Sequence, residues 1–134
     1  IHGRETWRLV GAIADESVSS VYARGPRAVG TIARIAALVR RLVQPDSADE
    51  NLFERIVESV RFISTERLSR DELSIVEIVS VARILFILGY IDAGQPGLEP
   101  AAERDWKRDD LRTYALCRRA LVHAINTALV ASHL

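Results

Sequence analysis

Three arginines have a spacing that could serve phosphate binding. Arg27, Arg34 and Arg41 follow one another at intervals of seven residues in a segment with helical periodicity. Seven residues make about two helical turns, so the three side chains would share one polar stripe with about 10 Å between neighbours. A row of guanidinium groups at that spacing could follow a nucleic-acid backbone. The alternative is an ordinary solvated helix face, because arginine commonly covers exposed helix surface.

A fourth arginine, Arg118, could recognise a carboxylate. If residues 107–133 form one helix, the helical angle places Arg118 within an apolar arc that also contains Tyr114 and Leu121. An unpaired charge is costly to bury, so this guanidinium needs a carboxylate partner. That carboxylate could come from the protein itself, with Glu77 as one candidate. It could also belong to a partner peptide in a groove formed by Arg118, Tyr114 and Leu121.

No group of residues predicts catalysis or a metal centre. His2, His123 and His133 lack metal-ligand spacing, and the single Cys117 is expected to be a packing residue. Trp106 could stack on a base, but three aspartates close to it in the sequence favour a packing role. We therefore expect a protein that is not an enzyme and that uses no metal and no cofactor.

The charge of the chain is balanced overall but unevenly distributed. Among 134 residues, 18 basic side chains face 18 acidic ones. Up to residue 45, seven arginines accompany three acidic residues, so this part carries +4 and the remainder −4. Nucleic-acid contacts are therefore expected toward the N-terminal side. One cysteine favours a reducing compartment, and the longest apolar run is shorter than the roughly 20 residues of a membrane span. We expect a cytoplasmic protein without a membrane partner.

Helical periodicity predicts a mainly α fold, a bundle of about four to five helices. Capping boxes begin at Ser47 and Ser69, and Gly89 supplies a residue suited to end a helix. The helix before Gly89 is apolar nearly all round, which places it at the centre of the bundle. The expected helices cover residues 27–43, the segment from the Ser47 cap to about 65, residues 70–88 and residues 107–133, with a loop over 91–105.

The opening segment alternates in the manner of a short strand. Trp7, Leu9, Gly11 and Ile13 fall on one side of the alternation. A lone strand needs a partner to be stable, and the sequence contains no methionine. We therefore expect a fragment whose N-terminal neighbour is absent, with residues 1–14 as the end of that neighbour and residues 15–134 as a helical domain.

The order of these motifs resembles the C-terminal portion of the RecO family of bacterial recombination mediators. The resemblance covers about residues 4–91 and rests on "GRETWRLVGA", "LFERIVESVRFIS" and "RILFILGY". Leu88, Gly89 and Tyr90 match a leucine-glycine-tyrosine signature of that family. The resemblance implies that the opening strand is the last strand of an absent OB-fold. Many members carry four zinc-binding cysteines after the signature, and this chain has none there, which implies a zinc-free member.

The resemblance also implies a function. Such proteins are non-enzymatic DNA repair and recombination mediators that bind single- and double-stranded DNA, bind the acidic C-terminal tail of SSB, and act with RecR to load RecA. On this view the stripe of Arg27, Arg34 and Arg41 would contact DNA, and Arg118, with Tyr114 and Leu121, would receive the tail. The alternative is a structural scaffold or oligomerisation module that self-associates through apolar helices and has no affinity for nucleic acid.

Overall fold

The structure, a computed structural model, describes residues 23–43, 50–103 and 105–132 and is mainly helical over these ranges. They contain five α-helices and two short 3₁₀ helices, and no strand. The mainly α prediction is confirmed, whereas the predicted strand, the domain boundary after residue 14 and the Ser47 cap lie outside the described residues. The elements are α3 (Pro26–Leu42), α4 (Glu50–Thr65), α5 (Arg70–Ile87), η1 (Glu99–Ala102), η2 (Arg108–Asp110), α6 (Leu111–Leu116) and α7 (Arg118–Ala131).

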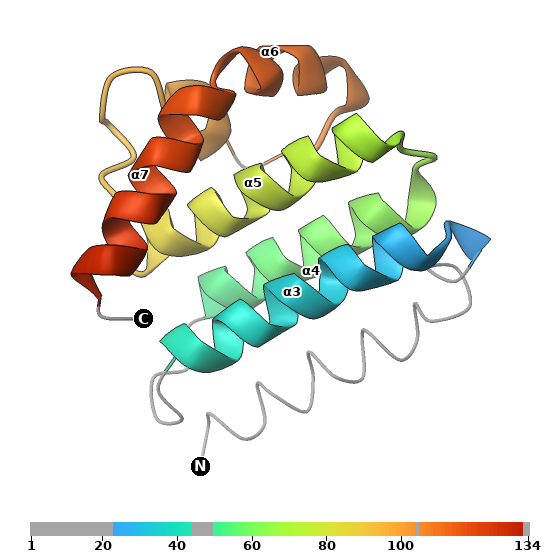
Figure 1. The fold of residues 1–134 in the computed structure, drawn as a ribbon, viewed down its shortest axis with the longest axis horizontal. Coiled ribbons are helices and arrows are strands. Elements are labelled where there is room, and N and C mark those ends of the chain that lie inside the picture. The colour runs from blue at the N-terminus through green and yellow to red at the C-terminus, as the bar shows by residue number, and fades with distance from the viewer. Residues whose placement is uncertain (1–22, 44–49, 104, 133–134) are drawn as a thin grey trace.

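Helix α5 is the centre of the fold, as its sequence predicts. It contacts α3 and α4 on one side and η1, α6 and α7 on the other (Figure 1). Val76, Val79 and Leu85 of α5 have no exposed surface. A helix with neighbours on several sides must be apolar around most of its circumference, because each side is removed from water.

Both ends of α5 follow the local signals in the sequence. At its start, the Glu72 N–H donates to Ser69 Oγ at 3.1 Å and the Ser69 N–H donates to Glu72 Oε1 at 2.9 Å. At its end, Gly89 has φ of 82° and the Tyr90 N–H donates to the Leu85 carbonyl at 2.9 Å. The capping box and the glycine stop are both confirmed, since each satisfies backbone groups that a helix end leaves unpaired.

The last predicted helix is wrong as one continuous element. The described part of this range, residues 107–132, instead contains η2, α6 and α7, with a break at Cys117. The Cys117 N–H donates to the Tyr114 carbonyl at 3.0 Å, three residues back, so the last turn of α6 is tightened. The break lets α6 pack against η1 and α5 while α7 takes a new direction along α5 (Figure 1). Cys117 itself packs against the core, as expected.

None of the described helices is long and apolar enough to cross a membrane.

Candidate functional site

A groove between α3 and α5 brings three arginines together beside the predicted stripe. We call it the basic groove, and its volume is about 440 Å³. Arg27 and Arg34 of α3 line it together with Arg70 from the first turn of α5. Glu77 is its only carboxylate among the described residues. The full lining consists of Pro26, Arg27, Gly30, Thr31, Arg34, Arg70, Leu73, Ser74 and Glu77.

The three stripe arginines are exposed on α3, but within the described residues one of them is paired with a carboxylate and the other two are not. Arg34 forms an ion pair with Glu77, and its Nη2 also lies 3.4 Å from Thr31 Oγ1. Arg27 and Arg41 form no ion pair with any described residue. Because a salt bridge neutralises part of the charge that a phosphate would see, Arg27 and Arg41 are the stronger candidates for phosphate contacts.

Arg118 is exposed, so the prediction that it lies inside an apolar arc is wrong. The break at Cys117 makes Arg118 the first residue of α7, where its side chain is exposed. There Nη2 donates to Ser74 Oγ at 3.3 Å, at the edge of the basic groove. Glu77, the candidate internal partner, pairs with Arg34 instead.

The other two residues predicted to bind a peptide are part of the core. Tyr114 is 1% exposed and Leu121 is 0% exposed, so neither side chain can line a surface groove. Arg118 instead borders a shallow hollow of about 750 Å³ beside α7, here called the α7 hollow. Leu116, 88% exposed, contributes an unusual apolar surface to it. Its lining is Ala115, Leu116, Arg118, Arg119, Val122, His123 and Asn126.

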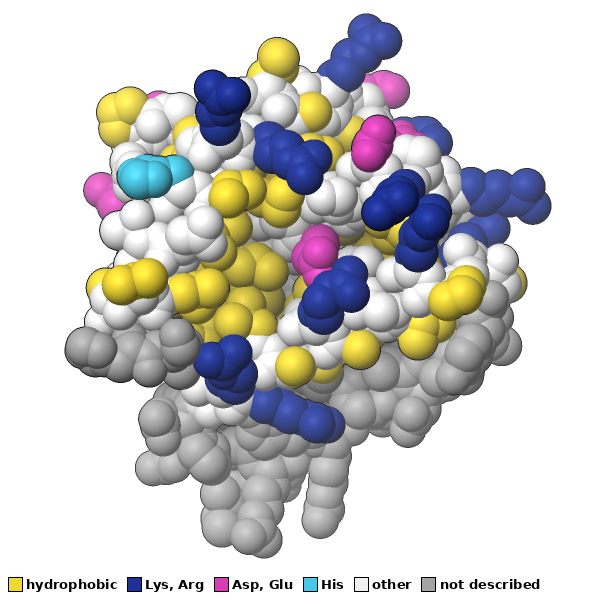
Figure 2. Space-filling model, in the orientation of Figure 1, with side chains coloured by type: hydrophobic (Ala, Val, Ile, Leu, Met, Phe, Trp, Pro, Cys, Tyr) yellow, Lys and Arg dark blue, Asp and Glu magenta, His cyan; other side chains and the backbone are white. Residues whose placement is uncertain are grey.

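Three of the helices seen in the view of Figure 1, α3, α6 and α7, are strongly basic. Helix α3 contains four arginines, α6 one and α7 two, and none of these three helices contains Asp or Glu. All seven guanidinium groups belong to exposed residues. Figure 2 shows basic side chains spread over this face with few acidic ones between them. We call it the basic face; its arginines are Arg27, Arg34, Arg40, Arg41, Arg112, Arg118 and Arg119.

Two buried arginines are not among the residues predicted from the sequence to form a site. The first is Arg83 of α5. It is 4% exposed, its Nε donates to the Ala101 carbonyl at 2.9 Å, and its Nη2 donates to Tyr114 Oη at 3.0 Å and to the Asp105 carbonyl at 3.3 Å. Burial lowers the pKa of the Arg83 guanidinium and raises that of the Tyr114 hydroxyl. The available signal was the position of Arg83 inside an otherwise apolar run.

The second is Arg55 of α4, which is 5% exposed. Its Nη2 lies 3.3 Å from Glu54 and its Nη1 lies 3.3 Å from Glu58. One turn later on α4, Ser59 accepts a hydrogen bond of 3.1 Å from Ser80 of α5, and both serines are buried. The bond between Ser59 and Ser80 makes the α4–α5 interface partly polar, and we call this interface, with Arg55 and Arg83 on its two helices, the polar seam. The sequence signals it only by placing Arg55 between the core positions of an amphipathic helix.

Trp106 has the packing role that its sequence context favours. Its ring stacks on Phe62 with 5.1 Å between centroids and meets Tyr114 edge-on at 6.0 Å. The Arg83 guanidinium carbon lies 4.3 Å from the centroid of the Trp106 ring, which adds a cation–π contact. Through its contacts with Phe62 and Arg83, Trp106 packs the segment before α6 against α4 and α5.

Comparison of the chain with family models, curated proteins and solved structures gives no match. The resemblance to RecO therefore rests on the motifs quoted above. Over the ranges that the structure describes, no three His, Cys, Asp or Glu side chains come together as a metal site would require.

Proposed function

We propose that the chain is a non-enzymatic nucleic-acid-binding module of a RecO-type recombination mediator, with the basic face as its DNA-binding surface. The observation that carries this proposal is the complete lack of acidic residues in α3, α6 and α7 beside seven exposed arginines. Such a surface attracts a polyanion by releasing its counterions and needs no base-specific contact. Single- and double-stranded DNA are both expected ligands.

Within this face the DNA backbone would follow α3. Arg27 and Arg41 lie at opposite ends of the stripe, about 20 Å apart by helical rise. Neither forms an ion pair with a carboxylate of the described residues. Arg70 and Arg118 border the basic groove from α5 and α7. A backbone lying over the groove would therefore meet guanidinium groups from three helices.

Partner binding is proposed for the α7 hollow, next to the DNA surface. Leu116 and Val122 offer apolar contacts, and Arg118 and Arg119 offer charge-assisted hydrogen bonds. An acidic, hydrophobic peptide such as the C-terminal tail of SSB has the matching chemistry. This site replaces the set of Arg118, Tyr114 and Leu121, because only Arg118 of that set reaches the surface. RecR and RecA enter the proposal only through the family resemblance.

DNA binding can be tested by fluorescence anisotropy with a labelled single-stranded oligonucleotide. We expect binding at low salt, with a slope of log K against log salt of about −2 if three phosphates are neutralised at roughly 0.7 each. Binding that is undetectable at 50 mM salt, about the level at which such contacts are strong, would contradict the proposal.

Peptide binding can be tested by calorimetry with a peptide of the SSB tail. Micromolar affinity that weakens with added salt is expected, and Arg118→Ala should abolish it. Arg112→Ala is the matched control, because Arg112 is an exposed arginine of the basic face outside the α7 hollow. Since Arg118 is exposed, its loss should change the free energy of unfolding by less than about 0.5 kcal/mol. Equal losses of affinity in both variants would show that the hollow has no specific role.

The alternative function, a structural or oligomerisation module, is favoured by one observation. Leu116 and Val130 are 88% and 76% exposed, which is unusual for large apolar side chains on two neighbouring helices. Sedimentation distinguishes the two proposals. Concentration-dependent dimers without any shift on adding oligonucleotide would favour the scaffold, and a monomer that sediments faster with oligonucleotide would favour the DNA-binding module.

A further inference from the structure

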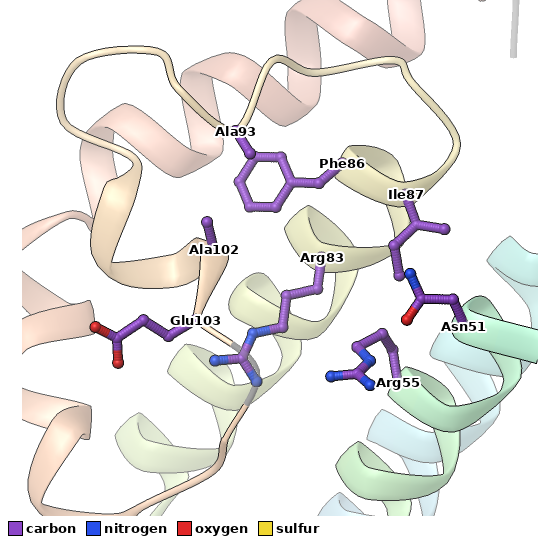
Figure 3. Close-up of a pocket in the computed structure, with 8 residues that line it drawn as sticks. All are labelled: Asn51, Arg55, Arg83, Phe86, Ile87, Ala93, Ala102 and Glu103. Atoms are coloured by element: carbon purple, nitrogen blue, oxygen red, sulfur yellow. The ribbon is translucent and has the colours of Figure 1, made fainter.

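A small pocket lies beside the polar seam, away from the basic face. Its volume is about 180 Å³, and no residue lines both this pocket and the basic groove. Arg55 comes from α4 and Arg83 from α5, while the segment after α5 closes the other side (Figure 3). We call it the Arg55–Arg83 pocket; its lining is Asn51, Arg55, Arg83, Phe86, Ile87, Ala93, Ala102 and Glu103.

Both arginines have buried nitrogen atoms with unused hydrogen-bonding capacity. Arg83 Nη1 has no hydrogen-bond partner, and neither have Arg55 Nε and Nη1. Arg55 Nη1 does lie 3.3 Å from Glu58, but only as an ion-pair contact. A buried N–H without an acceptor is costly, and more so on a charged group. Two such groups at one pocket indicate that an acceptor belongs there.

The charged side chains that line the pocket are two arginines and one carboxylate, which favours an anionic acceptor. Arg83 forms no ion pair with any described residue, since its hydrogen bonds go to two carbonyls and the Tyr114 hydroxyl. The carboxylates of Glu54 and Glu58 are 56% and 40% exposed, so water screens them. In Figure 3 the Arg83 guanidinium extends toward the segment of Ala102 and Glu103, the Arg55 guanidinium lies on its other side, and the Glu103 carboxylate points away from both.

The remaining walls are apolar, which narrows the class of ligand. Phe86, Ile87, Ala93 and Ala102 surround the space next to the guanidinium groups. A cavity of about 150 Å³ can admit a molecule as large as benzene, so 180 Å³ has room for a carboxylate with a short hydrocarbon chain. We propose that the Arg55–Arg83 pocket binds a small oxyanion, a short-chain carboxylate in the first place, whose oxygens accept from Arg55 and Arg83.

The test uses the fluorescence of Trp106, because the guanidinium group of Arg83 packs against its ring. In a Trp7→Phe background Trp106 is the only indole, because the chain has two tryptophans. Sodium butyrate is titrated at constant ionic strength, and inorganic phosphate is titrated in a parallel arm. We expect a saturable change with a millimolar midpoint. A lower midpoint for butyrate identifies a carboxylate ligand, and a lower midpoint for phosphate identifies a phosphate group.

Two variants and one control connect the signal to the pocket. Arg55→Gln should raise the butyrate midpoint about tenfold or more, since it removes charge-assisted donors. Ala93→Leu keeps both arginines but fills the apolar part of the pocket, so it should abolish butyrate binding. This variant tests the pocket independently if Arg55→Gln does not fold. Arg61→Gln, an exposed arginine on the same helix, should leave the midpoint unchanged. The proposal is overturned if sodium chloride gives the same signal as butyrate, or if the folded variants bind like the parent chain.

Discussion

Two groups of arginines in this protein occupy contrasting regions, the basic face and the polar seam between α4 and α5. On the basic face seven arginines are exposed and unaccompanied by acidic residues in their own helices. In the seam Arg55 and Arg83 are about 95% buried and are held by carbonyls, hydroxyl, carboxylate and ring contacts. Arginine thus provides exposed positive charge in one region and stabilises the packing of the core in the other.

The difference follows from the cost of removing a charge from water. An exposed guanidinium keeps its hydration, so replacing it changes stability little but changes the potential that a polyanion meets. A buried guanidinium has exchanged water for fixed protein groups, so its removal leaves those groups unpaired. Stability and DNA affinity should therefore respond to different arginines, and this separation can be tested.

The largest expected effect on stability is that of Arg83→Ala. It removes the hydrogen bonds to Ala101, Asp105 and Tyr114 and the stacking on Trp106, so the free energy of unfolding should fall by about 3 kcal/mol. Urea unfolding followed by circular dichroism measures this loss. Arg61→Ala, an exposed arginine of α4, should stay within about 0.5 kcal/mol. A loss below about 1 kcal/mol for Arg83→Ala would remove the contrast between the two regions.

A second prediction applies the same substitution, glycine to alanine, at two positions where opposite effects on stability are expected. Gly89→Ala, after α5, places a side chain at φ of 82° and should destabilise the protein by about 1 kcal/mol. Gly30→Ala, inside α3, should stabilise it by about 0.5–1 kcal/mol, because alanine loses less entropy in a helix. The added Cβ would meet only Arg34 Nη1 at 3.3 Å, the far end of a flexible side chain. In thermal unfolding, the midpoint temperature of Gly89→Ala should therefore lie below that of the parent protein and the midpoint of Gly30→Ala above it. Midpoints that shift in the same direction would contradict the conformations given for these two glycines.

The smallest expected effect within the seam is that of Arg55→Met. The carboxylates that pair with Arg55 are partly exposed and can return to water, and methionine retains much of the buried volume. The free energy of unfolding should change by less than about 1 kcal/mol, well below the Arg83 loss. Urea unfolding of the two variants side by side makes the comparison. A loss as large as that of Arg83→Ala would mean that Glu54 and Glu58 hold Arg55 as firmly as the carbonyls hold Arg83.

Local signals predicted most of the described fold because each has a short-range physical cause. The capping box at Ser69, the stop at Gly89 and the amphipathic period of α3 act within one or two turns. The break at Cys117 was missed because nothing in its own residues excludes a helix. It is explained by α6 and α7 packing on different parts of α5, which is a long-range effect.

The candidate site was predictable only where exposure does not depend on tertiary contacts. The stripe of Arg27, Arg34 and Arg41 lies on one side of a regular helix, and its exposure follows from the pattern. The placement of Arg118 failed because it assumed an unbroken helix. Arg34 pairs with Glu77, and Arg55 and Arg83 line the same pocket. Both arrangements bring together residues that are far apart in the sequence, so no local pattern predicts them.

The most direct test of the DNA-binding proposal compares two double variants that lose the same number of charges. Arg27→Ala with Arg41→Ala removes exposed arginines of the basic face, and Arg61→Ala with Arg67→Ala removes exposed arginines elsewhere. Anisotropy with a single-stranded oligonucleotide should show a loss of affinity for the first pair and a salt slope smaller by about 1.4, roughly 0.7 for each lost phosphate contact. The second pair should bind like the parent. Equal weakening in both would contradict a DNA-binding surface on the basic face.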